Sequence, residues 1–443
     1  MQQQFIDIYR EAHDQIATHS AQIFNDRRTG AATLAEQLPF PTAHTEEYLY
    51  CPLFNALTTD WGVNVNRLKF GLTPDKMFHC AVPGIKTSTV YFTNDVWVAT
   101  GEETDLGNGA FACSMKYASL HHNGLVRQYF RSALTDDNDG FQILSDMLVQ
   151  DGFFVYIPPY VQVEMPLQCV NMMRAGQALM GVNRNLIVVD HHASLEVIDC
   201  DHSMDDNAYF SIRNTEIIVA ENARFNYCLM ESTHANMNNL RRYAVKAYAN
   251  ASVDMSLFEL TNGNSRNHVE VDLCGEGAEV WLGGMLLADG KQHTDNYTII
   301  RHHAAHCRSN ELFKYILDDE AVCAFSGRIV VDHGAQKTES YQTNRNICIS
   351  TGAKALGRPQ LEIYADDVKC GHGATTGMLD EAALFYMRQR GIGLKEARTL
   401  LLQAFSAEVL EHIKSQHLSD RLQLLIERRL RGETMTCAGC KKN

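Results

Sequence analysis

A cysteine and a histidine lie two residues apart in the segment ADDVKCGHGATTG, residues 365–377. If the segment is extended, Cys370 and His372 project from one face, because side chains alternate along a strand. A thiolate and an imidazole can bind one soft or borderline metal ion, and the glycines beside His372 let a second chain approach closely. Two ligands do not complete a tetrahedral site, so a metal here needs others from elsewhere or from another chain. The alternative is that Val368, on the same face, marks an interior position and Cys370 fills the core.

Two other clusters could bind a metal, and both are weaker. His302 and His306 are four apart in RHHAAHC, but no glutamate follows the first histidine as in zinc proteases. The surroundings predict a strand, where residues four apart are ~13 Å apart. Cys437 and Cys440 form a lone C-x-x-C after a helix end, without the second pair of a zinc site. We interpret the first pair as ordinary histidines and the second as incidental tail cysteines.

The chain carries no catalytic motif that we can identify. A phosphate-binding loop G-x-x-x-x-G-K-[ST] and a nucleophile elbow G-x-S-x-G are both missing from the 443 residues. We therefore expect a protein that is not an enzyme. The formal charge of −14 argues against nucleic-acid and anionic-membrane partners, and no apolar run approaches the ~20 residues of a membrane span. The N-terminus is not a signal peptide, and the 13 scattered cysteines are typical of buried thiols, so we expect a cytoplasmic protein.

Residues 151–376 predict a repetitive β structure. Short strand-like runs rich in Val, Ile and Tyr are separated by turns that contain Ala193, Ala223, Ala251 and Ala278, spaced by 30, 28 and 27 residues. A period of this length made of strands and turns indicates a solenoid. Each coil of a solenoid buries alternate residues against the next coil. A β-sandwich with long strands is the alternative.

Helical segments flank this region. We predict an N-terminal helical or mixed domain over residues 1–150, with a helix over 3–26 that ends at Arg27–Gly30 and another over 141–149. We predict a C-terminal helical domain over 377–432 and a flexible tail over 433–443. The domain contains three helices. The first is capped by Asp380 and ends near Gly391, the second spans 394–414, and the third spans 418–431. The second has an apolar stripe made of Leu394, Ala397, Leu401, Ala404 and Phe405.

The order of several motifs resembles the SufB/SufD family of iron–sulfur cluster assembly proteins over roughly residues 150–415. The motifs are DGFFVYIPPYVQVEMPLQ, NTEIIVAENARF, LCGEGAEVWLGGMLL, SNELFKYILDDEAVCAFSGRIVVDHGAQKTESYQTNRNICIS and PQLEIYADDVKCGHGATTGMLDEAALFYMRQRGIG. The stretch DDVKCGHGA is similar to the SufD branch. Gly371 stands where relatives commonly have serine, and Tyr48-Leu49-Tyr50 stands where they often have Trp-Lys-Tyr.

The resemblance implies a right-handed parallel β-helix between helical end domains, in a non-catalytic scaffold subunit that pairs with SufB. Each of the two subunits would carry one copy of the ATPase SufC on its C-terminal helices. Cys370 and His372 fall on family positions implicated at the SufB–SufD interface, where iron or a nascent cluster is thought to assemble, so no cofactor is expected to bind stably to the chain alone. For the ATPase we assign these partner-binding residues: Leu384, Phe385, Tyr386, Arg390, Leu394, Leu401 and Phe405.

Physical reasoning agrees with a paired assembly, because the strand edges at a β-helix end invite pairing unless they are covered. One end would be covered by helices and the other would be free to add SufB or a second copy of this chain. Three alternatives stay open: a SufB-like chain that carries the cluster itself, a purely structural homodimer, and a carbohydrate-active β-helix enzyme. For the enzyme we find no aligned set of Asp or Lys residues.

Overall fold

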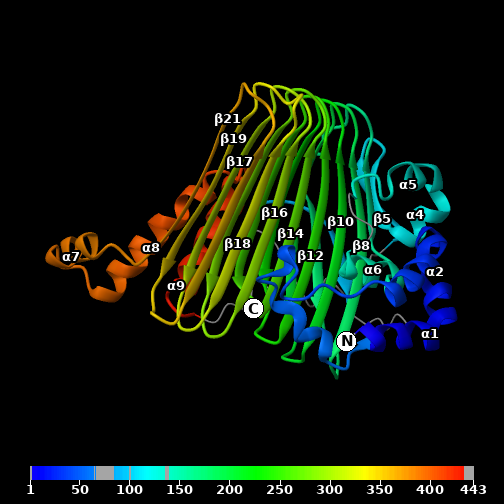
Figure 1. The fold of residues 1–443 in the computed structure, drawn as a ribbon, viewed down its shortest axis with the longest axis horizontal. Helices are drawn as coiled ribbons and strands as arrows, with labels where there is room; N and C mark the ends of the chain where they lie inside the picture. The colour runs from blue at the N-terminus through cyan, green and yellow to red at the C-terminus, as the bar shows by residue number, and fades with distance from the viewer. Residues whose placement is uncertain (1, 64, 66–83, 99–100, 135–138, 434–443) are drawn as a thin grey trace.

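The computed structural model describes residues 2–63, 65, 84–98, 101–134 and 139–433. Its centre is a parallel β-solenoid in which the chain passes alternately through two long sheets (Figure 1). One sheet has the strand order β20-β18-β16-β14-β12-β10-β8-β6-β5-β4, with β1 beside β8, and we call it sheet A. Sheet B has the order β21-β19-β17-β15-β13-β11-β9-β7-β2-β3. The predicted solenoid is confirmed, and the sandwich alternative is wrong.

The strands from β6 to β21 form eight successive coils within the described chain. Parallel neighbours pair in register, so each side chain lies above a counterpart one coil earlier. The strands of sheet A in these coils are β6 (Phe153–Ile157), β8 (Leu179–Val189), β10 (Tyr209–Val219), β12 (Met237–Ala247), β14 (Asn264–Leu273), β16 (His293–His302), β18 (Val322–Val331) and β20 (Lys354–Ile363). Those of sheet B are β7 (Leu167–Met173), β9 (Ser194–Ser203), β11 (Arg224–Ser232), β13 (Ser252–Thr261), β15 (Glu279–Ala288), β17 (Arg308–Leu317), β19 (Glu339–Cys348) and β21 (Lys369–Gly377).

The repeated alanine turns connect sheet A to sheet B. All four alanines are buried and lie directly before a strand of sheet B. The residue before each alanine has a left-handed backbone, with φ of 57° at His192, 58° at Asn222, 53° at Asn250 and 72° at Gly277. Histidine, asparagine and glycine tolerate this conformation better than β-branched residues do. The small alanine then fits inside the corner, which explains why the repeat was visible in the sequence.

The N-terminal helix predicted over residues 3–26 is wrong, because the structure has two helices, α1 (Gln2–His19) and α2 (Gln22–Gln37). The chain breaks where the Ala21 N–H donates to the Gln150 carbonyl oxygen (3.1 Å) instead of continuing the helix. Gly30 lies inside α2 and ends nothing. Arg28 is buried and donates to the carbonyl oxygens of Met147 and Val149, both at 2.7 Å. These contacts with residues far along the chain fix α2, and local spacing could not reveal them.

The remaining N-terminal elements cover the first coils. Strands β2 to β5 extend the two sheets beyond the solenoid, so this region is more than helical. The helix predicted over 141–149 is confirmed as α6, capped by Asp139, which accepts from the Gln142 N–H (2.9 Å). The elements are η1 (Glu46–Tyr48), η2 (Pro52–Phe54), η3 (Ala56–Thr58), β1 (Gly62–Val63), β2 (Ser88–Thr93), β3 (Val96–Val98), β4 (Glu103–Gly107), β5 (Ala110–Ser114), α4 (Met115–His121), α5 (Asn123–Tyr129) and α6 (Gly140–Leu148).

Residues 46–58 form a segment that crosses the outer face of sheet A, where η2 contacts β12, β14 and β16. The buried Arg266 guanidinium lies between the rings of Tyr48 (4.4 Å) and Tyr297 (5.0 Å) and donates to the Glu47 carbonyl oxygen at 2.6 Å. Glu46 forms an ion pair with Arg358 of the last coil. We call residues 46–58 the crossing segment.

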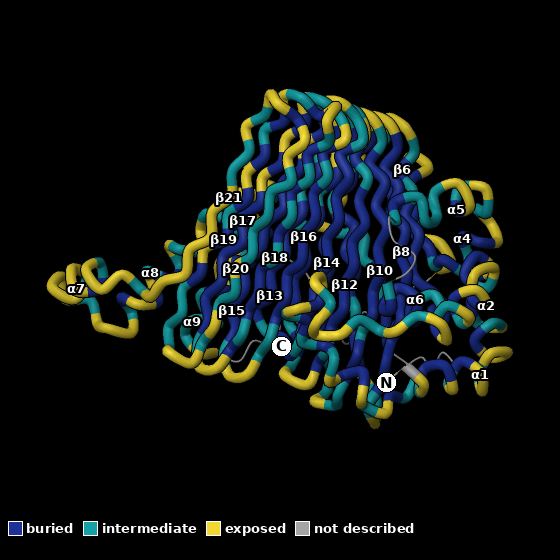
Figure 2. Tube along the Cα trace, in the orientation of Figure 1, coloured by how far each residue is buried: buried dark blue, intermediate teal, exposed yellow. Residues whose placement is uncertain are grey.

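Three helices follow the solenoid: α7 (Glu381–Gln389), α8 (Leu394–Leu410) and α9 (Gln416–Leu430). The predicted cap is confirmed, because Asp380 accepts from the N–H groups of Ala382 and Ala383. Helices α8 and α9 pack on the outer face of sheet B in a shared apolar cluster, whereas α7 projects from the body and is mostly exposed (Figures 1 and 2). Among the described residues, no helix combines the length and apolar composition needed to cross a lipid bilayer.

Candidate partner interface and metal ligands

The solenoid ends in an open coil. Strand β20 is the last strand of sheet A and β21 the last of sheet B, and no described strand pairs with their outer edges. Helices α8 and α9 lie against the outer face of sheet B, and α7 projects from the body, so they do not pair with these strand edges (Figure 1). The backbone donors and acceptors of an uncovered edge strand can pair with another chain. We call this surface of β20 and β21 the open end.

Cys370 and His372 lie on β21 at the open end, on the side that faces the solenoid interior. The register aligns Cys370 with Ser340 and His372 with Gln342, both of which are buried inward-facing residues of β19. Cys370 is half-buried against a small apolar cluster, and this burial raises the pKa of its thiol. His372 is exposed. The two side chains therefore share one face, as the alternation along the strand predicts.

This pair can supply two metal ligands and no complete site. No group of three or more His, Cys, Asp or Glu side chains suited to hold a metal ion occurs among the described residues. A soft or borderline metal bound by the Cys370 thiolate and the His372 imidazole would need ligands from a chain that covers the open end. Cys370 also packs partly against apolar residues, so it fills part of the core as the alternative interpretation predicted.

The other histidine pair does not form a site. His302 is fully buried, and its Nε2 lies 2.9 Å from the Ser309 hydroxyl oxygen. Burial lowers the pKa of His302 to about 4, so its imidazole is neutral at physiological pH. His306 lies in the following turn with its side chain exposed. Cys437 and Cys440 lie outside the described residues.

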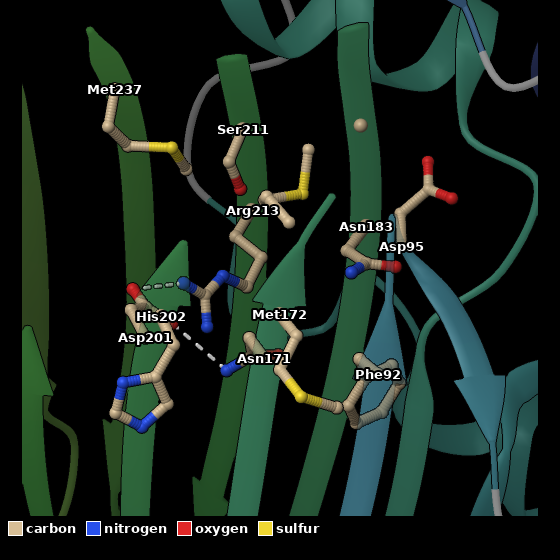
Figure 3. A pocket seen from close by; sticks show the side chains of 12 residues that line it. Phe92, Asp95, Asn171, Met172, Asn183, Asp201, His202, Ser211, Arg213 and Met237 are labelled. Carbon is tan, nitrogen blue, oxygen red and sulfur yellow. Dashed lines mark hydrogen bonds and ion pairs between the residues drawn. The ribbon is translucent and has the colours of Figure 1, made fainter. Parts of the chain in front are cut away.

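The cavity drawn in Figure 3 is not a substrate pocket. Its volume of about 20 Å³ has room for about one water molecule. Asp201 occupies its wall and pairs with Arg213, while the Asn171 amide donates to Asp201 at 3.0 Å. A shallow depression between α2 and α6 is larger, about 490 Å³, and there Arg131 and Asp146 pair at 2.7 Å. Neither resembles the long acidic groove of a carbohydrate-active solenoid.

The residues assigned to ATPase docking divide into exposed and packed sets. On α7, Phe385 and Tyr386 expose 62% and 56% of their surface, and Leu384 is buried. Arg390 donates to the Tyr386 hydroxyl at 2.8 Å and lies over its ring. Leu394, at the start of α8, is also exposed. The exposed set is therefore an aromatic and cationic surface on a projecting helix.

The apolar stripe predicted on α8 is displaced from the face that is buried. Leu401 and Phe405 are half-buried, Ala404 is exposed, and only Ala397 of the five is fully buried. The face that packs on sheet B carries Leu402, Val409 and Leu410 instead. Lys314 of β17 reinforces this contact, because its Nζ donates to the Phe405 carbonyl oxygen at 2.8 Å and lies over the ring. Met378 and Leu400, which were not assigned to docking, are also exposed apolar residues of this region.

The fold and its open end define a parallel β-solenoid protein whose candidate site lies on the last coil. Comparison with protein families makes the class specific. The SufBD N-terminal region matches residues 1–169, and the SufBD core domain of SUF-system FeS cluster assembly matches residues 172–405. The core match alone covers more than half of the chain. The chain belongs to the SufBD family of iron–sulfur cluster assembly proteins.

Named relatives agree with this assignment. A SufBD family protein of Synechocystis sp. is 26% identical over 416 residues, which cover 90% of both chains. The SufD protein of Escherichia coli is 29% identical over 273 residues, 60% of this chain and 64% of the relative. The SufD protein of Bacillus subtilis is 28% identical over 320 residues, covering 71% and 72%.

Proposed function

We propose that this chain is a non-catalytic scaffold subunit of the SUF assembly that pairs with SufB through the open end and docks a SufC-type ATPase through α7 and the start of α8. The observation that carries the proposal is the uncovered last coil, where two unpaired strand edges adjoin Cys370 and His372. A solenoid that ends in this way gains hydrogen bonds and buried area when a second solenoid stacks on it. The exposed aromatic surface of α7 supports a second, separate docking site.

The cargo of this interface would be iron or a transient iron–sulfur cluster. Cys370 and His372 would supply two ligands, and SufB would supply the others, so the chain alone should hold neither stably. The ten described cysteines are all free thiols, which suits work in the reducing cytoplasm. Burial favours the protonated thiol of Cys370, and a metal ion would displace that proton when it binds.

The ATPase would act on the interface from outside. Two SufC copies, one on each subunit, would close on each other when they bind nucleotide. Because α8 packs on β15 and β17, movement of the C-terminal helices would strain the last coils and change the contact at the open end.

The test uses purified chains. The full chain, SufB and SufC are mixed, and the complexes are separated and weighed by native mass spectrometry. We expect a particle with this chain, SufB and two SufC copies, and we expect Cys370 alkylation in it to change when ATP is added. Absence of a joint particle with SufB would contradict the pairing.

Reconstitution separates the remaining candidates. Under anaerobic conditions with iron and sulfide, a SufB-like chain would take up a stable cluster by itself, and this chain should not. If the chain formed a purely structural homodimer, the amount of homodimer would stay the same when SufB is added. If the chain is a scaffold subunit, SufB would replace one of the two copies in the homodimer.

A further inference from the structure

Two columns of inward-facing side chains run through sheet B and end at Cys370 and His372. The first column contains Leu195, Phe225, Val253, Val280, Ser309, Ser340 and Cys370. The second contains Val197, Tyr227, Met255, Leu282, Glu311, Gln342 and His372. In both, the residues up to β15 belong to the main hydrophobic core. From β17 onwards the side chains are ones that can form hydrogen bonds or bind metals.

Burial of the polar residues of the second column, Glu311 and Gln342, costs free energy. Glu311 and Gln342 expose 0% and 1% of their surface, and burial of polar groups costs free energy unless they are hydrogen bonded. The Gln342 Nε2 donates to the Glu311 Oε2 at 2.5 Å. The Gln342 Oε1 is buried and accepts no hydrogen bond from any described residue. The hydrogen bond to Glu311 accounts for the Gln342 amide nitrogen, but not for its buried Oε1, which a leucine, as at Leu282 two coils earlier, would not introduce.

His372 follows Gln342 in the register, one strand further toward the open end, at the ~4.8 Å spacing of neighbouring strands. We propose that Gln342 is a positioning residue for His372. When the exposed imidazole turns toward the solenoid interior, the buried Gln342 Oε1 accepts a hydrogen bond from one ring N–H, which leaves the lone pair of the other ring nitrogen directed to the open end. Glu311 holds the Gln342 amide in the orientation that this requires.

Such an acceptor is what a metal-binding histidine commonly uses, because the bond fixes both the tautomer and the ring orientation. The inference that this hydrogen bond prepares His372 to bind a metal rests on the proposed function of His372 as a ligand. The existence of the hydrogen bond does not depend on that function, so the hydrogen bond and the metal binding can be tested separately.

The test is the tautomer of His372 in the metal-free full chain, measured by ¹⁵N-histidine NMR at pH 8.5, with His372→Ala to assign the signals. We expect one tautomer to dominate in the parent chain and a mixed population in Gln342→Leu. Asn344→Leu is the matched control, because Asn344 is a buried amide on the same strand, aligned with Ala374, whose side chain has no hydrogen-bond donor. It should leave the tautomer unchanged, and thermal melting of both variants checks that each one folds.

A second readout is Co²⁺ binding by the complex with SufB, followed by visible absorption. We expect Gln342→Leu to weaken Co²⁺ binding by about tenfold or more and Asn344→Leu to leave it unchanged. The same tautomer mixture in the parent chain and in Gln342→Leu would overturn the positioning role. If the tautomer responds but His372→Ala leaves Co²⁺ binding intact, the positioning stands and the ligand function of His372 fails.

Discussion

Burial raises the pKa of the Glu311 carboxyl group from 4.5 to about 7, because the solenoid interior solvates a carboxylate poorly. Between these values the unfolded chain has lost a proton that the folded chain keeps. The contribution of Glu311 to stability is therefore full below about pH 4.5 and falls as the pH rises to about 7. At ~1.4 kcal/mol per pKa unit, the loss is about 3 kcal/mol.

We expect Glu311→Gln to remove this pH dependence, because the amide cannot ionise. The variant should unfold at higher urea concentration than the parent chain at pH 8, with a much smaller difference at pH 4.5. Glu164→Gln is the control, since Glu164 is exposed and should shift neither midpoint. If the stability difference between the parent chain and Glu311→Gln were the same at both pH values, the raised pKa of Glu311 would be contradicted.

At the scale of the element, α9 is held on sheet B by a few leucines on one face. Leu422 is fully buried in the cluster that joins the helix to the sheet, whereas Leu424 of the same helix is partly exposed. We expect Leu422→Ala to lower stability by about 2–5 kcal/mol, through lost burial and a cavity. Leu424→Ala should cost much less. Urea unfolding measures both, and hydrogen exchange should show faster opening of α9 in Leu422→Ala alone.

Helix α7 differs from α9 because its aromatic side chains, Phe385 and Tyr386, are mostly exposed. We expect Phe385→Glu to reduce capture of a SufC-type ATPase by at least about tenfold, since exposed aromatic residues carry much of the energy of protein interfaces. Surface plasmon resonance with purified ATPase measures the change. Leu120→Glu is the control: Leu120 exposes 70% of its surface, but lies on α4 in the N-terminal region. Equal capture by both variants would remove α7 from the proposed docking site.

At the scale of the whole molecule, the orientation of the β21 backbone determines which positions face a partner. The Lys369 N–H points away from the free edge of β21, toward the preceding coil, and donates to the Thr338 carbonyl oxygen (2.8 Å). Along a parallel strand the backbone groups of successive residues point to opposite sides, so Ala374, five residues on, presents its N–H at the free edge. Ala374→Pro should leave the internal ladder intact and weaken pairing with SufB about tenfold or more, as measured by titration calorimetry. Ala374→Val, which keeps the donor, should pair normally, and equal affinity of the two variants would argue against edge pairing.

The sequence was sufficient to predict the solenoid because its turns depend on local chemistry. A left-handed residue followed by a small buried alanine recurs in four successive coils, and both features depend on neighbouring residues. The break between α1 and α2 could not be predicted in the same way, since Ala21 and Arg28 are fixed by carbonyl groups about 120 residues away. The face shared by Cys370 and His372 followed from alternation alone. The polar residues beneath them required the strand register, which pairs Gln342 with His372 thirty residues later.

The crossing segment has a further consequence for how solenoids of this kind can evolve. Each coil of a solenoid contacts only its neighbours, so the contacts between coils do not limit the number of coils. Here Tyr48 is seated against Arg266 of β14, while Glu46 reaches Arg358 of β20. Duplication of one coil between those strands would move Arg358 away by one strand spacing of ~4.8 Å and break the ion pair. The crossing segment thus fits only one number of coils between β14 and β20. A homologous protein that gained or lost a coil there would have to change its N-terminal region at the same time.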